Sequence, residues 1–225
     1  MNLKSTIDLV FAGGMGVLAP EGQRSGIFKR RIAGPARVEA HGIVGDEHGD
    51  PRVHGGPEKA VHQYAADNYA HLAQAFPQCS NALVPGSLGE NLSALHLTER
   101  NVHIGDIFRA GSTVLQVSQP RSPCWKISHR FGIERMSMHV AQTRITGWYY
   151  RVIEPGLIQQ GDEMRLLDRQ TERFSIDQFW QVQSSHRPAL DDLLELAAVP
   201  GLAEDWKRRL IERVKWLRKH VAAAD

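Results

Sequence analysis

Short apolar runs, each bounded by glycine or proline, follow one another through the first three quarters of the chain. Runs of roughly four to eight residues between turn-forming residues are typical of β-strands. The predicted strands cover residues 7–11, 26–32, 36–43, 60–64, 106–109, 113–118, 148–153 and 163–167. This pattern predicts a β-rich barrel or sandwich that carries only a few helices.

Two local patterns support this prediction. Residues 110–112, with the sequence Ala-Gly-Ser, make a short hairpin loop between two of the predicted strands. One helix interrupts the strands, because Tyr69, Leu72 and Phe76 fall on one face and Pro77 ends the pattern.

The pattern changes to helix after Asp168. Ser175 and Gln178 form a capping box for one helix, Pro188 opens a second, and residues 202–220 form a third. The apolar stripe of the third helix consists of Trp206, Leu210, Val214 and Leu217. The chain is therefore predicted to be β-rich α+β, with a β-barrel domain at residues 1–168 and a three-helix domain at residues 169–225.

Composition narrows the function. A hydrophobic fraction of 42% and a charged fraction of 23% fit a soluble globular protein, and a net charge of +2 gives no case for stable nucleic-acid binding. No apolar run is long enough for a membrane span. A first strand that enters a glycine turn is favoured over a signal peptide, because Asp8 interrupts the apolar stretch. Two cysteines make no disulfide framework, so a reducing cytoplasm is expected, although a bridge between Cys79 and Cys124 stays open.

Residues 45–62 form a glycine-rich segment with several possible roles. Its glycines allow backbone N–H groups to surround an anion, and Lys59 adds a positive charge, so a phosphate-bearing ligand would suit it. A solvated loop is the alternative. A zinc site is a further alternative, although the spacing matches no zinc signature. The metal-competent side chains are Asp46, His48, His54 and His62.

A second glycine turn covers residues 85–92. Glu90 and Asn91 follow Gly89 directly, and they would either bind a ligand or tie the turn to its neighbours.

Cys124 lies in a stiff loop between prolines at the end of a predicted strand, a place where functional residues are common. Arg121 and Lys126 would favour a thiolate there, and a thiolate is either a nucleophile or a soft metal ligand. A cysteine hydrolase with His129 as its base is one alternative, and an unreactive loop cysteine is another.

Together these segments resemble the MOSC family, which is named for the C-terminal domain of molybdenum-cofactor sulfurase, and within it the bacterial YiiM type. The resemblance rests on residues 45–64, 86–92, 101–127 and 146–156, and the helical tail is similar to the one that follows the core in that subfamily. The resemblance implies a MOSC-type β-barrel that uses molybdopterin, the molybdenum cofactor, to reduce N-hydroxylated compounds such as hydroxylaminopurine bases to amines.

The resemblance also implies roles for individual residues. Cys124 is the expected molybdenum ligand and catalytic residue. The expected cofactor-binding residues are His54, Gly55, Gly56, Lys59, Glu90, Asn91, Ser118, Arg121 and Arg151. For each of these except Cys124, a turn or packing role is the alternative.

The partners follow from the same reading. An N-hydroxylated small molecule is the expected substrate, an external reductase is the expected electron donor, and a homodimer stays open. The last helix carries many basic residues, which suit either a solvated outer face or a docking surface for the reductase. The rival function is a non-catalytic carrier of the cofactor, or of persulfide sulfur on Cys124.

Overall fold

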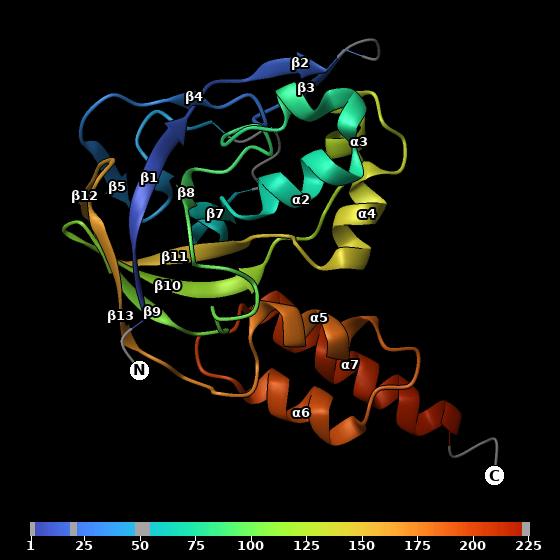
Figure 1. Ribbon diagram of the computed structural model, residues 1–225. Helices are drawn as coiled ribbons and strands as arrows, with labels where there is room; N and C mark the ends of the chain where they lie inside the picture. The colour runs from blue at the N-terminus through green and yellow to red at the C-terminus, as the bar shows by residue number, and fades with distance from the viewer. Residues whose placement is uncertain (1–2, 19–21, 48–54, 222–225) are drawn as a thin grey trace.

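A closed β-barrel forms the centre of the molecule (Figure 1). The computed structural model describes residues 3–18, 22–47 and 55–221. Strands pair in the order β13-β9-β10-β11-β7-β8-β1, and β13 also pairs with β1, which closes the barrel. These strands are β1 (Lys4–Ala12), β7 (Val61–Ala65), β8 (Leu92–Ala94), β9 (Ile107–Ala110), β10 (Thr113–Pro120), β11 (Trp148–Glu154) and β13 (Glu163–Asp168). The predicted MOSC-type barrel with a helical region is thus confirmed.

Smaller elements surround the barrel. Strand β4 extends the main sheet from β1, β2 pairs with β3, and β12, β5 and β6 form a separate three-stranded sheet. Their bounds are β2 (Gly16–Leu18), β3 (Gln23–Ser25), β4 (Arg30–Arg31), β5 (Ala36–Glu39), β6 (Gly42–Ile43) and β12 (Gly156–Ile158). The helices beside the barrel are η1 (Pro57–Lys59), α2 (Asn68–Ala75), η2 (Pro77–Ala82), α3 (Trp125–Phe131) and α4 (Met136–Thr143).

The β9–β10 hairpin forms where the sequence places it. Gly111 in its loop has a φ of 56°, and a Cβ there would lie 2.4 Å from Oδ2 of Asp162. Only glycine fits this conformation and this close approach. Alternate residues of β10 and β11 then point into the barrel, and Leu115, Val117, Trp148 and Tyr150 are fully buried.

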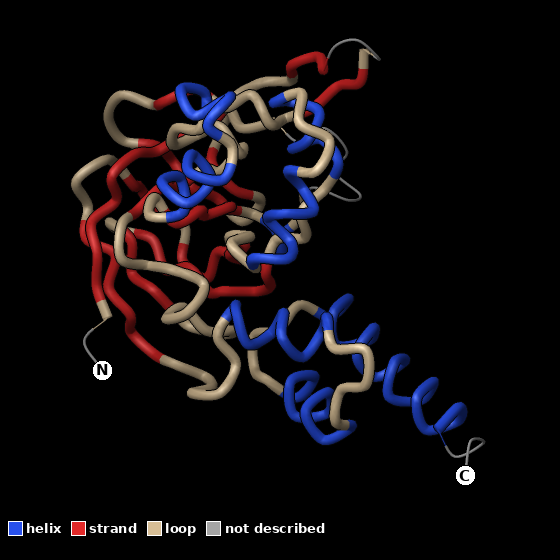
Figure 2. The backbone as a smooth tube through the Cα atoms, turned by 45° about the vertical axis from the view of Figure 1, so that its right-hand side comes forward, coloured by secondary structure: helices blue, strands red, loops and turns tan. Residues whose placement is uncertain are grey.

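The last three helices pack against one side of the barrel, below β9 and β10 in Figure 1, and Figure 2 shows the same arrangement from another side. They are α5 (Ile176–Ser184), α6 (Leu190–Ala198) and α7 (Glu204–Val221). The predicted capping box at Ser175 and Gln178 is present. The apolar residues of these helices belong to the same buried cluster as the barrel interior. The division into two domains at Asp168 stays a prediction.

Some predicted elements differ from the structure. Of the predicted strand at residues 26–32, only Arg30–Arg31 is a strand, and the predicted strand at residues 36–43 is divided by a turn at Ala40 and His41. Helix α3 was not predicted because it is short, with Pro123 just before its N-cap and Gly132 in the left-handed conformation at its end. Among the described residues, no helix is both long enough and apolar enough to cross a membrane.

Candidate active site

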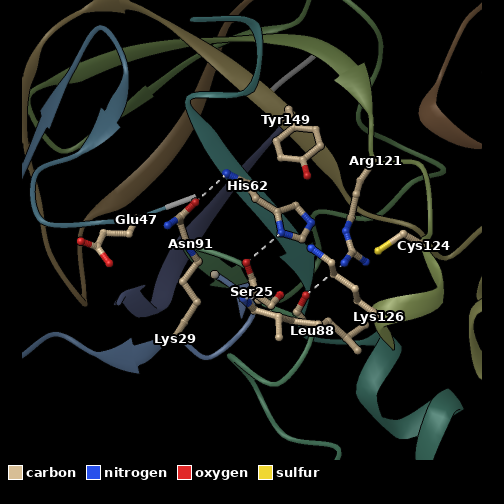
Figure 3. Close-up of a pocket in the computed structure, with 13 residues that line it drawn as sticks. Ser25, Lys29, Glu47, His62, Leu88, Asn91, Arg121, Cys124, Lys126 and Tyr149 are labelled. Carbon is tan, nitrogen blue, oxygen red and sulfur yellow. Dashed lines mark hydrogen bonds between the residues drawn. The ribbon is translucent and has the colours of Figure 1, made fainter. Parts of the chain in front are cut away.

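A cavity of about 550 Å³, including its open mouth, lies at one end of the barrel (Figure 3). It is bounded by the segment after β3, the turn before β8, strands β7 and β11, and the loop from β10 to α3. The side chains in it that can bind or react are Lys29, Glu47, His62, Asn91, Arg121, Cys124, Lys126 and Tyr149. The loop that carries the thiol therefore meets residues from four other parts of the chain.

Cys124 is the N-cap residue of α3 and has an extended backbone. Its side chain is partly buried and lies beside the guanidinium of Arg121 in Figure 3. Cys79 is also a free thiol, so the two cysteines do not form the bridge that the sequence left open. Burial raises the pKa of the Cys79 thiol, which makes it a poor thiolate.

Arg121 is buried at the edge of the cavity, with 7% of its surface exposed. Its Nη2 donates to the carbonyl of Leu88 at 3.3 Å, and its backbone N–H donates to Gly147 at 3.0 Å. Its Nη1 has no hydrogen-bond partner among the residues that the structure describes. A buried N–H group that lacks a partner is costly, so the Nη1 side of this guanidinium is suited to an anionic ligand.

His62 lies on β7 opposite Tyr149 on β11, as a directly paired residue, with ring centroids 5.1 Å apart. Burial, and then the charge of Arg121, holds the pKa of His62 well below 6.5, so the ring is neutral. Its Nδ1 lies 3.3 Å from the carbonyl of Gly89, which can only accept, so Nδ1 carries the proton. Nε2 is therefore an acceptor, and within the described chain it has no partner.

Tyr149 keeps its proton in this environment. Burial raises the pKa of its phenol, and nearby Arg121 opposes that shift only in part. The hydroxyl points toward the same space as His62 and Arg121 in Figure 3. It is consequently a neutral group that can donate a hydrogen bond to a ligand.

Lys29 and Asp46 form a buried ion pair at the opposite wall of the cavity. Asp46 also accepts hydrogen bonds from the backbone of Gly13 at 3.0 Å and from Nδ2 of Asn91 at 2.9 Å. Burial lowers the pKa of Lys29, and its attraction to Asp46 opposes that shift. The charge of Lys29 is thus balanced locally, which leaves Arg121 and Lys126 as the cations nearest the thiol.

The structure brings three of the predicted site residues into the cavity, namely Asn91, Arg121 and Cys124. The Asn91 side chain is already engaged, because its Oδ1 accepts from the His62 backbone at 2.9 Å and its Nδ2 binds Asp46. Asn91 therefore joins β7 to Asp46 in the cavity wall. Its side chain can contact a ligand only from this fixed position.

Glu90 and Ser118 do not line the cavity. Glu90 is fully buried and accepts from the Tyr69 hydroxyl and the Gly86 backbone, each at 2.5 Å. Burial raises the pKa of its carboxyl, and those two hydrogen bonds oppose the shift. The Ser118 hydroxyl is within 2.6 Å of the Glu58 carbonyl and 3.0 Å of the Tyr149 carbonyl. Both residues hold the chain together in this structure.

Four other predicted site residues lie where the barrel meets the helical tail. Arg151 pairs with Glu58 and donates to Gln116 at 2.8 Å. Gly55 and Gly56 lead into η1, and Lys59 is its last residue. Burial lowers the pKa of Lys59, the charge of Asp205 on α7 raises it, and the charge of Arg209 on α7 lowers it. None of the four is among the cavity residues. His54 lies outside the described residues.

Lys29 and Tyr149 are cavity residues that the sequence did not single out, and His62 was considered only as a metal ligand. His62 and Tyr149 lie on predicted strands, but their pairing joins residues that are distant in the chain. Within residues 3–18, 22–47 and 55–221, no group of three His, Cys, Asp or Glu side chains is placed to hold a metal ion. Two of the four possible zinc ligands, His48 and His54, lie outside the described residues, so the alternative zinc site stays untested.

The cavity suits one type of ligand in particular. It offers a single soft donor, the Cys124 thiol, together with N–H groups of Arg121 and Lys126 that have no carboxylate partner among the described residues. Soft thiolates bind transition metals, while guanidinium and ammonium groups bind phosphate. The residues present therefore fit a group that joins a soft metal to an anionic substituent.

Comparison with known proteins places this chain in a family. The MOSC domain model matches residues 50–165. YiiM of Escherichia coli K12 is 36% identical over 195 residues, which is 86% of each chain. The crystal structure of Escherichia coli YiiM matches with a TM-score of 0.78 and 28% identity, over 94% of this chain and 92% of that one. A Gibberella moniliformis protein named "Reductase" is 37% identical over 177 residues, which cover 78% of this chain and 31% of that protein.

Proposed function

The chain belongs to the MOSC domain family, and from this premise we propose that it is a molybdenum-cofactor-dependent enzyme that reduces N-hydroxylated compounds to amines. Hydroxylaminopurine-type base analogues are the proposed substrates. The observation that carries the proposal is the convergence of Cys124, Arg121 and Lys126 on one cavity. A relative that is named a reductase adds support for redox chemistry.

The cofactor, when bound, would supply the two-electron chemistry of the reaction R–NHOH + 2e⁻ + 2H⁺ → R–NH2 + H2O. Cys124 would hold the metal through its thiolate. Arg121, through the Nη1 that has no partner within the described chain, and Lys126 would donate hydrogen bonds to the anionic part of the cofactor. These contacts would fix the cofactor at the end of the barrel.

Neighbouring residues would control protons and water. Tyr149 holds a proton on its hydroxyl, and His62 presents a lone pair at Nε2, so the cavity offers one neutral donor beside one neutral acceptor. Leu88 and Ile27 form an apolar part of the lining, which would help to exclude water when a ligand is bound.

An electron donor must restore the reduced state after each turnover. We propose a separate reductase for this role. The rival function is a carrier that binds the cofactor or a persulfide on Cys124 and does not turn over. A cytoplasmic location, consistent with two free thiols, belongs to the same proposal.

Molybdenum content tests the proposal directly. The wild type and the Cys124→Ala and Cys79→Ala variants would be produced in cells that make abundant molybdopterin, and their metal would be measured by elemental analysis. We expect near-stoichiometric molybdenum in the wild type and in Cys79→Ala, and almost none in Cys124→Ala. Metal-loaded wild type should then consume 6-hydroxylaminopurine with an artificial electron donor. Retention of cofactor without turnover would favour the carrier. Absence of metal from all three proteins would contradict both the enzyme and the cofactor carrier.

A further inference from the structure

A second concavity is lined by Trp125, the residue that follows Cys124. It is a groove formed by one face of α3 and the start of α4, and it contains about 790 Å³ of space including its open side. Cys124 lines the thiol cavity and Trp125, the next residue, lines the groove. Consecutive Cα atoms are about 3.8 Å apart, so a ligand in the groove lies close to the thiol loop.

Trp125 is the largest side chain of the groove, and 46% of its surface is exposed. Its ring meets the His129 ring at 84° with centroids 5.4 Å apart, so the imidazole does not lie flat over the indole. Ile133 adds an apolar wall. An exposed indole beside an apolar wall is a surface on which a planar ring can stack.

The rest of the groove is polar and well ordered by hydrogen bonds. The Ser128 hydroxyl donates to the Glu134 carbonyl at 2.9 Å and also lies 2.9 Å from the Ser137 hydroxyl. These bonds join the end of α3 to the start of α4. The exposed carboxylate of Glu134 stands at the rim, where it can accept a hydrogen bond from an amino group on a ring.

We propose that this groove binds the planar heteroaromatic ring of the substrate, with the ring stacked on Trp125 and its N-hydroxyl group directed into the thiol cavity. The proposal rests on the proposed function and adds to it a binding site for the nucleobase-sized ring of the substrate. The groove would raise the affinity for such rings and would leave small aliphatic hydroxylamines unaffected.

The chain contains a matched control for Trp125. Trp216 on α7 is also an exposed tryptophan, at 58%, and it also contacts a histidine four residues later in its helix. There the rings are stacked, with centroids 4.4 Å apart and planes at 21°. Figure 1 shows that α7 leads away from the barrel toward the C-terminus. Removal of Trp216 therefore tests the loss of an exposed indole without any change at the groove.

Steady-state kinetics would separate the two tryptophans. Values of kcat/KM would be measured for 6-hydroxylaminopurine and for N-methylhydroxylamine, with wild type, Trp125→Ala, Trp125→Phe and Trp216→Ala. Stacking of a base on an aromatic side chain corresponds to roughly a tenfold to hundredfold effect. We expect Trp125→Ala to lose this factor through KM, for the purine only. Trp125→Phe should keep most of the activity, and Trp216→Ala should match the wild type.

Binding of adenine, the amine that forms from 6-hydroxylaminopurine, gives a readout that needs no turnover. Isothermal titration should show about tenfold weaker binding to Trp125→Ala than to Trp216→Ala. An equal loss for both substrates in Trp125→Ala, or unchanged adenine binding, would overturn the groove proposal and leave the reductase function intact. If the wild type reduced neither substrate, the proposed function would fail, and adenine binding would still decide whether the groove holds a base.

Discussion

The thiol cavity and the helical tail both contain many basic side chains, but these side chains have different surroundings. In the tail, Lys207 pairs with Glu204 at 2.7 Å and Arg209 pairs with Asp205 at 2.7 Å. In the cavity, Arg121 and Lys126 have no carboxylate partner among the described residues. Charge that is paired within the protein contributes to structure, whereas charge that has no partner is available to a ligand.

This difference bears on whether the last helix has a solvated outer face or a docking surface for a reductase. Several basic residues of α7 form ion pairs within the helix, and Arg213 donates to the Gln183 and Ser185 carbonyls at the end of α5. Its buried stripe of Trp206, Leu210 and Val214 faces the core. The arrangement favours a packed helix with a solvated outer face, and docking of a reductase on α7 stays a prediction.

The largest expected effect concerns the core that the two regions share. Phe179 of α5 is fully buried and packs edge-on against Trp206, with centroids 4.9 Å apart. Phe179→Ala should lower the free energy of unfolding by about 3–5 kcal/mol, because it leaves a cavity. Calorimetry should show a single transition at a lower temperature.

Phe108→Ala, at an equally buried position in the barrel, is the matched variant. It should shift the same transition. If Phe179→Ala instead gave two transitions and moved only one of them, the barrel and the tail would be energetically independent domains. That result would support the predicted division into two domains at Asp168.

Two arginines test the difference in charge pairing. Arg121→Met should reduce retained molybdenum at least tenfold, because charge-assisted hydrogen bonds to an anion are each worth about 1.5–3 kcal/mol. Its melting temperature should stay near that of the wild type, since the substitution removes a buried cation that lacks a carboxylate partner within the described residues.

Arg213→Met should give the opposite pattern. It removes the hydrogen bonds from Arg213 to two carbonyls at the C-terminal end of α5, so the melting temperature should fall by a few degrees while molybdenum content is unchanged. Elemental analysis and thermal unfolding of both variants provide the check. Equal loss of metal in both variants would mean that Arg121 is no more important for cofactor binding than Arg213, which contradicts the proposed difference between cavity and tail.

The smallest effect is a difference in pH dependence between two glutamates. Burial raises the pKa of Glu90 above 4.5, whereas a hydrogen bond and attraction to Lys207 lower the pKa of Glu204 below 4.5. The folded protein therefore holds the Glu90 proton more tightly than the unfolded chain does, and stability from this group is lost as pH rises through its raised pKa. For Glu204, stability is present above 4.5 and is lost as pH falls.

Glu90→Gln and Glu204→Gln should respond accordingly. From acidic to neutral pH, Glu90→Gln should become progressively more stable relative to wild type, while Glu204→Gln should become slightly less stable. Urea unfolding at a series of pH values measures both. A parallel response of the two variants would show that burial of Glu90 does not control its titration.

Local sequence alone determines several features of this protein. The β9–β10 hairpin, the capping box at Ser175 and the apolar stripe of α7 were predicted, because each depends on residues close together in the chain. Cys124 was identified for the same reason, since prolines and basic residues surround it locally. The family resemblance, which rests on several motifs in order along the chain, predicted the MOSC-type barrel.

Tertiary structure decided which of the predicted residues share the cavity. Lys59 and Arg151 belong to motifs that suggest ligand binding, yet β11 and η1 place them at the junction with α7. His62 and Tyr149 enter the site because two distant strands pair in one register, and a shift of one residue would turn both side chains to the other face. Burial and ion pairing are also properties of the folded arrangement, so only the structure separates the paired cations of the tail from those near the thiol.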